Sequence, residues 1–288
     1  MRVDVAASSA NLGPGFDCVG LALDLVDELD ATLTDSGLLI EVTGEGADAV
    51  PRDASHLVVR SIRQGLDAWG AAMPGLHLRC HNRIPHGRGL GSSAAAIVGG
   101  LAIAWGIAHP GLAIDRSELL AQASIAEGHP DNAGAAVFGG ALLAWAGAAA
   151  TRHVPLELHP GLAFRVYVPN FETPTEAARK VLPTLVPRED AVVQASRAAL
   201  LMHALTRAPE HLLEATEDRL HQGYRADLMP ASYDLMGRLR SLGTPAVISG
   251  AGPSVLALGT PEQLGPPCDA DGFRVLDLAA GEGVALRP

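Results

Sequence analysis

The chain has 288 residues, of which 48% are hydrophobic, 18% are charged and only 4% are aromatic, and its formal net charge is −11. This length fits one or two packed domains, and so much apolar material excludes global disorder. The negative charge argues against nucleic acid as a partner and against binding to an anionic membrane surface.

The three cysteines, Cys18, Cys80 and Cys268, are widely spaced and give neither a disulfide framework nor metal-ligand spacing. No apolar run reaches the length of a signal peptide or of a membrane span. These features predict a cytoplasmic protein with no membrane partner.

The first elements in chain order are strands and one helix. Weak alternation predicts a strand over 2–7, followed by a loop over 8–17 with the sequence SSANLGPGFD. Strand character returns at 38–43 and 76–81. Between these two strands the helical spacing of Val58, Ile62 and Leu66 predicts a helix over 56–69, which Ser55 could cap.

A glycine-rich loop at 85–91 then opens into a small-residue helix that ends near His109. A second helix should begin at Asp115 or Ser117 and run toward Glu127. It should be followed by a loop, GHPDNAGAAVFGG, over 128–140 and by a strand, ALLAWA, over 141–146.

The second half of the chain repeats the mixture of strands and helices. Residues 164–169 predict a strand, 174–240 are mostly helical by periodicity, and 245–260 predict a strand, a turn with the sequence SGAGPS, and another strand. Mixed rather than alternating elements indicate an α+β fold with two sub-domains. We place the boundary between them near residue 155.

The glycine-rich loop carries the strongest chemical signal. Gly87, Gly89 and Gly91 free the backbone to turn its N–H groups toward one point, and the helix that follows adds its own unpaired N–H groups there. Ser92 and Ser93 could cap that helix, bind a phosphate oxygen or ligate magnesium. The loop lacks the lysine of a Walker P-loop and does not match GxGxxG, so a phosphate cradle of another kind is indicated, with a turn that serves only chain reversal as the alternative.

At this point the chain resembles a family, the GHMP kinases. PHGRGLGSSAAA resembles their second signature, and SSANLGPGFD and SGAGPS resemble the first and third in order and spacing. The resemblance implies an N-terminal ATP-binding domain over 1–155, with a sheet, helices and a left-handed βαβ unit, and a ferredoxin-like C-terminal domain over 156–288. It also implies a homodimer and the cofactors ATP and Mg²⁺. The implied ATP-binding residues are Pro85, His86, Gly87, Arg88, Gly89, Leu90, Gly91, Ser92, Ser93, Ala94 and Ala95.

The first signature is most similar to one branch of this family, the homoserine kinases, which implies L-homoserine as the substrate. By this resemblance Asp17 binds the ammonium group, and Arg179 and Arg225 bind the carboxylate, a task that suits the planar fork of arginine. Asn11 would orient the attacking hydroxyl. Thr175 and His129 would line the same pocket.

The implied reaction converts ATP and L-homoserine into ADP and O-phospho-L-homoserine, a step of threonine biosynthesis. Glu127, with Ser92 or Ser93, would ligate magnesium, because these are hard oxygen donors. Asn132 would face the transferred phosphoryl group, so that Asn11, Asn132 and Arg225 form the expected catalytic set. No strong general base stands out: Asp131 is a weak candidate, and Lys180, the single lysine of the chain, lies in the arginine segment.

Two alternatives stay open at the level of sequence. The chain could be another GHMP small-molecule kinase with an amino acid or polyol substrate, or a catalytically silent metabolite sensor on the same fold. Taken singly, each residue also has an ordinary explanation: Asp17 and Asn11 as turn residues, Glu127 as a helix-end carboxylate and His129 as a loop-packing imidazole.

Overall fold

A mixed seven-stranded sheet organises the first unit in the computed structural model, which describes residues 1–148 and 150–287. The strands run in the order β11-β1-β2-β4-β3, while β5 pairs with β2 and β6 pairs with β5. Their bounds are β1 (Arg2–Asn11), β2 (Gly15–Thr34), β3 (Leu38–Gly44), β4 (Gly75–Asn82), β5 (Ala141–Ala146), β6 (Thr151–Leu156) and β11 (Ala285–Arg287).

The first two strands form a long antiparallel hairpin, and this corrects the loop predicted over 8–17. β1 continues through Asn11 and β2 begins at Gly15, so only three residues connect them. The pairing shifts register between Ala10 and Asn11, which marks an irregularity of the kind that re-aims side chains beside active sites. The sequence did not reveal β2 as a strand, although its distal half alternates between buried and exposed residues.

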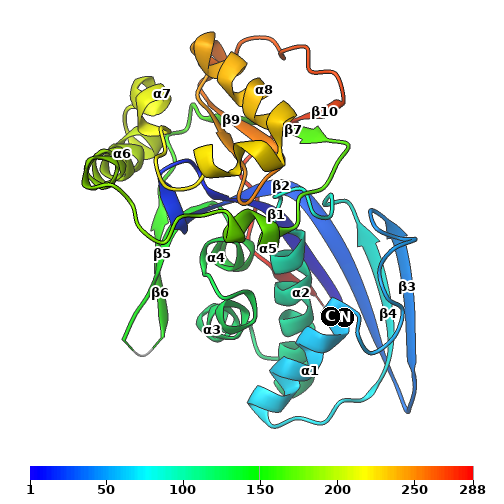
Figure 1. The fold of residues 1–288 in the computed structure, drawn as a ribbon. Helices are drawn as coiled ribbons and strands as arrows, with labels where there is room; N and C mark the ends of the chain where they lie inside the picture. Colours follow the sequence, from blue (N-terminus) through cyan, green and yellow to red (C-terminus); the bar gives the residue numbers. More distant parts are fainter. Residues whose placement is uncertain (149, 288) are drawn as a thin grey trace.

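Helices cover one face of this sheet (Figure 1). They are α1 (Leu57–Trp69), α2 (Ser92–Ala108), α3 (Arg116–Glu127) and α4 (Asp131–Phe138). The predicted helices at α1, α2 and α3 are confirmed, and Asp115 caps α3 by accepting from the N–H groups of Ser117 and Glu118. Ser55 does not cap α1, because its own N–H and hydroxyl donate to Asp53.

The segment predicted as a loop over 128–140 contains α4 instead. Six of its eight residues are buried, including Ala133, Gly134 and Ala135, so packing against the sheet forms this helix despite its weak local propensity. The parallel pair β3–β4, with α1 as its connection, is the βαβ unit implied by the family resemblance.

The second unit is a four-stranded antiparallel sheet with the order β10-β7-β9-β8. Its strands are β7 (Ala163–Pro169), β8 (Ala246–Ile248), β9 (Val255–Gly259) and β10 (Phe273–Leu278). The accompanying helices are α5 (Thr175–Lys180), α6 (Arg188–Thr206), η1 (Pro209–His211), α7 (Leu212–Ala215), η2 (Gly223–Leu228), α8 (Pro230–Ser241) and α9 (Pro261–Leu264). Helices before the second strand and after the third, with the fourth strand beside the first, give the ferredoxin-like βαββαβ arrangement.

The chain crosses between the two units more than once. It leaves the first sheet after β6 and enters the second at β7, then returns so that β11 pairs with β1. The two termini therefore lie side by side (Figure 1). The domain boundary near residue 155 stays a prediction.

No helix within the two described ranges combines the length and the apolar content needed to cross a bilayer.

The close approach of β2 and α4 predicts opposite effects for two glycine substitutions. A Cβ at Gly20 would collide with the main-chain oxygen of Asp131, whereas a Cβ at Gly237, inside α8, would meet nothing within 4 Å. We expect Gly20→Ala to lower the free energy of unfolding by about 1–3 kcal/mol, as overpacking does. The matched control Gly237→Ala should raise it by about 0.5–1 kcal/mol, because alanine favours the helix. Urea denaturation measures both, and a Gly20→Ala protein as stable as the parent would contradict the packing.

Candidate functional site

A cavity of about 170 Å³ lies where the two units meet. Six segments line it: the β1–β2 hairpin, the glycine-rich loop with the start of α2, the α3–α4 turn, α5, η2 and the loop after β8. The lining residues are Ala10, Asn11, Phe16, Asp17, Gly87, Gly89, Gly91, Ser92, Ser93, Ala94, Glu127, His129, Asp131, Asn132, Thr175, Arg179, Arg225, Gly250 and Ala251. Every residue predicted from sequence to bind the substrate or a metal is among them.

The hairpin delivers Asp17 to the cavity through unusual backbone conformations. Asn11, Leu12 and Asp17 have φ values of 72°, 45° and 55°, a region that Asn and Asp enter more readily than other non-glycine residues. The Asn11 side chain holds the turn: its Nδ2 donates to Gly250 O at 2.9 Å and its Oδ1 accepts from the Asp17 N–H at 2.9 Å. Asn11 thereby fixes Asp17 relative to the second unit.

Asp17 and Arg179 form a two-pronged ion pair across the cavity. Arg179 Nη2 lies 2.8 Å from Asp17 Oδ1, and Nη1 lies 3.2 Å from Oδ2. The hydrogen bond and the charge of Asp17 raise the pKa of Arg179. Both side chains keep more than a third of their surface exposed, so a ligand can reach the pair.

Arg225 lies deeper, with a side chain only 2% exposed. Its Nε donates to Ala178 O at 2.9 Å, and its Nη1 donates to His221 Nδ1 at 3.1 Å and to Gly250 O at 3.2 Å. Burial, followed by the neighbouring charge of Arg179, lowers the pKa of Arg225 to about 10. Within residues 1–148 and 150–287 no carboxylate lies at ion-pair distance from it, and only the more distant charges of Asp17 and Asp218 oppose the lowering of its pKa.

Phe16 connects the two arginines. The guanidinium carbons of Arg179 and Arg225 lie 5.9 and 5.6 Å from the centre of its ring. The ring of His221 stacks against it at 5.0 Å.

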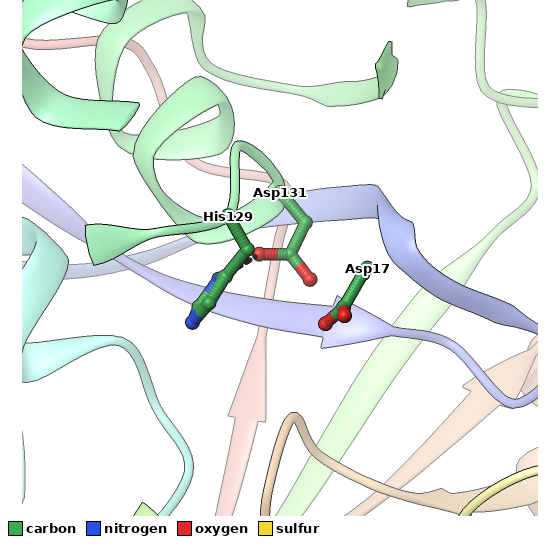
Figure 2. A group of neighbouring side chains, drawn as sticks. All are labelled: Asp17, His129 and Asp131. Atoms are coloured by element: carbon green, nitrogen blue, oxygen red, sulfur yellow. Dashed lines mark hydrogen bonds and ion pairs between the residues drawn. The ribbon is translucent and has the colours of Figure 1, made fainter. Parts of the chain in front are cut away.

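The α3–α4 turn places a histidine and two carboxylates on the opposite wall. Figure 2 shows His129 and Asp131 at the start of α4, with Asp17 of β2 facing them. His129 Nδ1 lies 2.8 Å from Asp131 Oδ1, and this hydrogen bond raises the pKa of His129 against the effect of burial. His129 Nε2 lies 3.9 Å from Glu127 Oε2.

Two sets of residues here could hold a metal ion, and their oxygens differ in availability. Asp17, His129 and Asp131 bring their ligand atoms within 4.8 Å of one another. However, Asp17 is paired with Arg179, and Asp131 Oδ1 already accepts from His129 and from the N–H of Asn132. Glu127 and the Ser92 and Ser93 hydroxyls accept and donate no hydrogen bond within the described ranges, so this predicted set offers free hard oxygens of the kind that Mg²⁺ takes.

The start of α2 has the features of an anion site. Gly91 is its N-cap in a left-handed conformation, and no side chain caps the first turn, which leaves helix N–H groups unpaired. Ser92 and Ser93 are therefore not caps, and that reading of the sequence was wrong. The loop approaches Ser8 so closely that a Cβ at Gly91 would collide with the Ser8 hydroxyl, which donates to Asn132 Oδ1 at 2.9 Å.

A second, more apolar cavity of about 290 Å³ shares Ser92 and Ser93 with the first. Its walls also include Asp27, Leu29, Val50, Pro51, Ser55, His56, Leu57, Val58, Asn82, His86, Ala95 and Ala96. Burial lowers the pKa of His56, which keeps this imidazole neutral, and raises the pKa of Asp27. The two cavities meet at the helix N-terminus.

The residues of the glycine-rich segment, 85–95, lie in different surroundings. Gly87, Gly89, Gly91 and Ala94 line the first cavity with the two serines, while His86 and Ala95 line the second. Leu90 is buried in the core, and Pro85 lies in a separate surface hollow. Arg88 turns away from both cavities: it donates to Pro169 O at 3.1 Å and to Glu172 Oε1 at 2.8 Å, which ties the loop to the second unit.

Sequence reasoning missed Ser8, Phe16, His221 and Gly250 as parts of this site. Phe16 adjoins Asp17 and His221 precedes Arg225 by one helical turn, so proximity to predicted residues was the available signal. Gly250 falls within the SGAGPS turn, and its main-chain oxygen accepts from Asn11 and Arg225. A contact made by a main-chain oxygen leaves no signal in the pattern of side chains.

The chain matches the family descriptions "GHMP kinases N terminal domain" over residues 56–140 and "GHMP kinases C terminal" over residues 193–265. It is 57% identical to a homoserine kinase of Cutibacterium acnes, with 99% of this chain and 98% of that protein covered. It is 52% identical to a homoserine kinase of Mycolicibacterium vanbaalenii, with 98% and 93% covered.

Solved structures agree with the sequence relatives. The crystal structure of a homoserine kinase from Cytophaga hutchinsonii superposes with a TM-score of 0.86 at 27% identity, covering 99% of this chain and 96% of that one. A mevalonate kinase at 13% identity has a TM-score of 0.67 over 97% of this chain and 99% of its own, which is a likeness of fold alone.

The hydrogen bond between His129 and Asp131 predicts how His129 titrates. Its folded-state pKa lies above the ordinary 6.5, so the stability it contributes is fully present below pH 6.5 and is lost as the pH rises through the folded pKa. Asp131→Asn removes the anionic acceptor and should shift the midpoint of His129 downward in an NMR titration. His153, whose pKa burial lowers, is the internal control and should not move. An unchanged midpoint of His129 in Asp131→Asn would contradict this assignment.

Proposed function

The chain belongs to the homoserine kinases of the GHMP family, and we propose that it transfers the γ-phosphoryl group of ATP to the side-chain hydroxyl of L-homoserine in the cavity between Asp17 and Arg225. The product is O-phospho-L-homoserine, and the reaction is a step of threonine biosynthesis. A homodimer and a cytoplasmic location remain predictions made from the sequence.

The observation that carries the assignment of the site is the buried guanidinium of Arg225, which has no carboxylate partner among the described residues. A substrate carboxylate supplies the missing charge, and both arginines line the same cavity. Asp17 lies beside them and takes the ammonium group. When the substrate binds, the Asp17–Arg179 ion pair is replaced by two new contacts. Asp17 then contacts the ammonium group of the substrate, and Arg179 contacts its carboxylate.

The phosphate donor occupies the remaining space. Its nucleoside fits the more apolar cavity, while its phosphates reach the first cavity past Ser92 and Ser93, which line both. There the uncapped N-terminus of α2 and the glycine-rich loop supply main-chain N–H donors. Arg88 contributes by holding the loop against Glu172 and the main chain of Pro169 rather than by contacting phosphate.

Glu127 with Ser92 and Ser93 would hold the magnesium ion, since no hydrogen bond within the described residues engages their side-chain oxygens and the nearest cationic group, His129 Nε2, lies 3.9 Å from Glu127 Oε2. A magnesium ion held there would supply positive charge that offsets the negative charge of the phosphates.

The chemical step forms a bond between the homoserine hydroxyl oxygen and the γ-phosphorus and breaks the bond from that phosphorus to the oxygen bridging it to the β-phosphate. Alignment dominates catalysis in such a loose transition state. The hydroxyl proton leaves late and passes to an oxygen of the transferred phosphoryl group or to water, and ADP is the leaving group. Asn132, fixed through Ser8, and the hairpin residue Asn11 border the reacting groups. Lys180 takes no part, because it is exposed and paired with Glu176 outside the cavity.

The assignment is tested by ADP release from magnesium-ATP with L-homoserine, D-homoserine, L-serine, L-threonine, mevalonate and galactose. We expect turnover chiefly with L-homoserine. Asp17→Asn removes the counter-charge for the ammonium group and should lower kcat/KM for L-homoserine about 100-fold, with the KM for ATP unchanged. The matched control Lys180→Ala removes a charge from the same neighbourhood and should retain the parent activity.

Each other outcome has a defined meaning. Turnover of mevalonate or galactose in place of L-homoserine would overturn the substrate, and binding of ATP with no turnover of any acceptor would overturn the activity. If Asp17→Asn impaired the use of ATP as strongly as the use of L-homoserine, the role of Asp17 at the ammonium group would be contradicted.

The magnesium site predicts a separate phenotype. Glu127→Gln keeps the size of the side chain but removes its charge, so the Mg²⁺ concentration for half-maximal activity should rise about 10-fold or more. Glu176→Gln, a change to an exposed carboxylate outside the cavity, is the control and should leave that concentration unaltered. An unchanged magnesium requirement in Glu127→Gln would assign the metal to other residues.

A further inference from the structure

His221 is a fully buried histidine that the proposed chemistry does not use. It lies two residues before the start of η2 and is 0% exposed. Its Nε2 lies 2.8 Å from Gly13 O in the β1–β2 turn, its Nδ1 lies 3.1 Å from Arg225 Nη1, and its ring stacks on Phe16. It therefore contacts the hairpin that carries Asp17, the buried Arg225 without a carboxylate at ion-pair distance, and the aromatic ring of Phe16.

The partners of the two ring nitrogens determine where the proton lies. Both groups near Nε2 are acceptors: Gly13 O, and Asp218 Oδ1 at 3.6 Å. Arg225 can only donate, so Nδ1 must offer its lone pair. Together these contacts select the neutral imidazole protonated at Nε2, and the lowering of the His221 pKa by burial agrees with this.

The environment holds the ring in this orientation. Asp218 accepts from the N–H groups of Leu220, His221 and Gln222 and from the side chain of Gln194, so its carboxylate is saturated and fixes the turn from which His221 projects. Gln222 in turn accepts from the N–H of Ile248 at the end of β8.

The hydrogen bonds of Arg225 show what this orientation achieves. Nε donates to Ala178 O, and Nη1 uses its two protons on His221 and Gly250 O. Within the part of the chain that the structure describes, Nη2 donates to no protein acceptor, so its two protons are left for a ligand in the cavity that Arg225 lines. Because His221 accepts from Nη1, the Nη2 edge of the Arg225 guanidinium is the one that remains available to a ligand.

We propose that His221 is a positioning residue for substrate recognition: by accepting from Arg225 Nη1 while donating to Gly13, it holds the Nη2 edge of Arg225 toward the carboxylate of the amino-acid substrate. The inference rests on the proposed function of the cavity and extends it to a residue that does not line it.

Two substitutions separate the contacts of the ring, because asparagine places its side-chain oxygen near the position of Nδ1 and glutamine places its amide nitrogen near Nε2. His221→Asn keeps an acceptor for Arg225 and loses the Gly13 contact. His221→Gln keeps the Gly13 contact and loses the acceptor. The quantity to measure is the Kd for L-homoserine by calorimetry, with a non-hydrolysable ATP analogue bound.

We expect His221→Gln to weaken L-homoserine binding about 10–30-fold and His221→Asn to weaken it about threefold or less, as for the loss and retention of a hydrogen bond to a charged donor. The Kd for the ATP analogue should stay unchanged in both. In an Arg225→Lys background, which removes the guanidinium, the difference between the two variants should disappear.

Other results would overturn the proposal. Equal binding by both variants, or the same difference with Arg225→Lys, would show that His221 serves packing alone. Failure of the unaltered protein to bind L-homoserine would refute the proposed function together with this inference. If a variant does not fold, the ¹⁵N shifts of His221 in the unaltered protein decide: a proton on Nδ1 instead of Nε2 would refute the arrangement.

Discussion

The buried positive charge of Arg225 is the constraint around which the site is built. A guanidinium that is 2% exposed and has no carboxylate partner in the described residues is costly in isolation, so its surroundings must compensate through hydrogen bonds. Three protein acceptors do this: Ala178 O, Gly250 O and His221 Nδ1. They come from α5, from the turn after β8 and from the residues just before η2. Stabilising this one cation therefore holds three separate segments of the second unit in fixed positions relative to one another.

The same requirement joins the second unit to the first. Gly250 O accepts both from Arg225 and from Asn11, and the N–H of Gly250 donates to Ala10 O. His221 reaches across to Gly13. The hairpin that presents Asp17 is thus attached to the elements that present the arginines, while Arg88 attaches the phosphate loop to the segment leading into α5. The proposed sites for homoserine and for ATP are therefore held together by one continuous set of contacts.

Local patterns in the sequence predicted the parts of this arrangement that short segments determine. The glycine-rich loop, the small-residue helix after it and the start of the next helix between Asp115 and Ser117 depend on neighbours within a few residues, and they form as predicted. Family resemblance added Asp17, Arg179 and Arg225, which do line one cavity. Their pairing was not visible: Asp17 and Arg179 are separated by 162 positions, and no local pattern reports that they touch.

The errors have a common physical origin. Residues 8–17 contain turn-forming types, yet β1 extends to Asn11 because it pairs with β2, the next strand of the chain. Burial of α4 against the sheet overrides its glycine and its weak helix propensity. Ser92 and Ser93 resemble caps, but the left-handed Gly91 occupies that position. The contacts of Arg88 with Pro169 O and Glu172 depend on how the two units pack and were not visible in the sequence, and its place among the ATP-binding residues stays a prediction.

The ion pair between Asp17 and Arg179 has a consequence for selectivity. The two side chains neutralise each other, so the pocket presents balanced charge to an arriving molecule. An amine alone would draw away Asp17 and strand Arg179 next to Arg225, two like charges side by side; a hydroxy acid alone would leave Asp17 without a cation. Only a molecule that carries both charges at the right separation leaves every group matched. The ion pair therefore competes with an incoming ligand for Asp17 and Arg179. Only a zwitterion replaces it without leaving one of these two side chains unpaired.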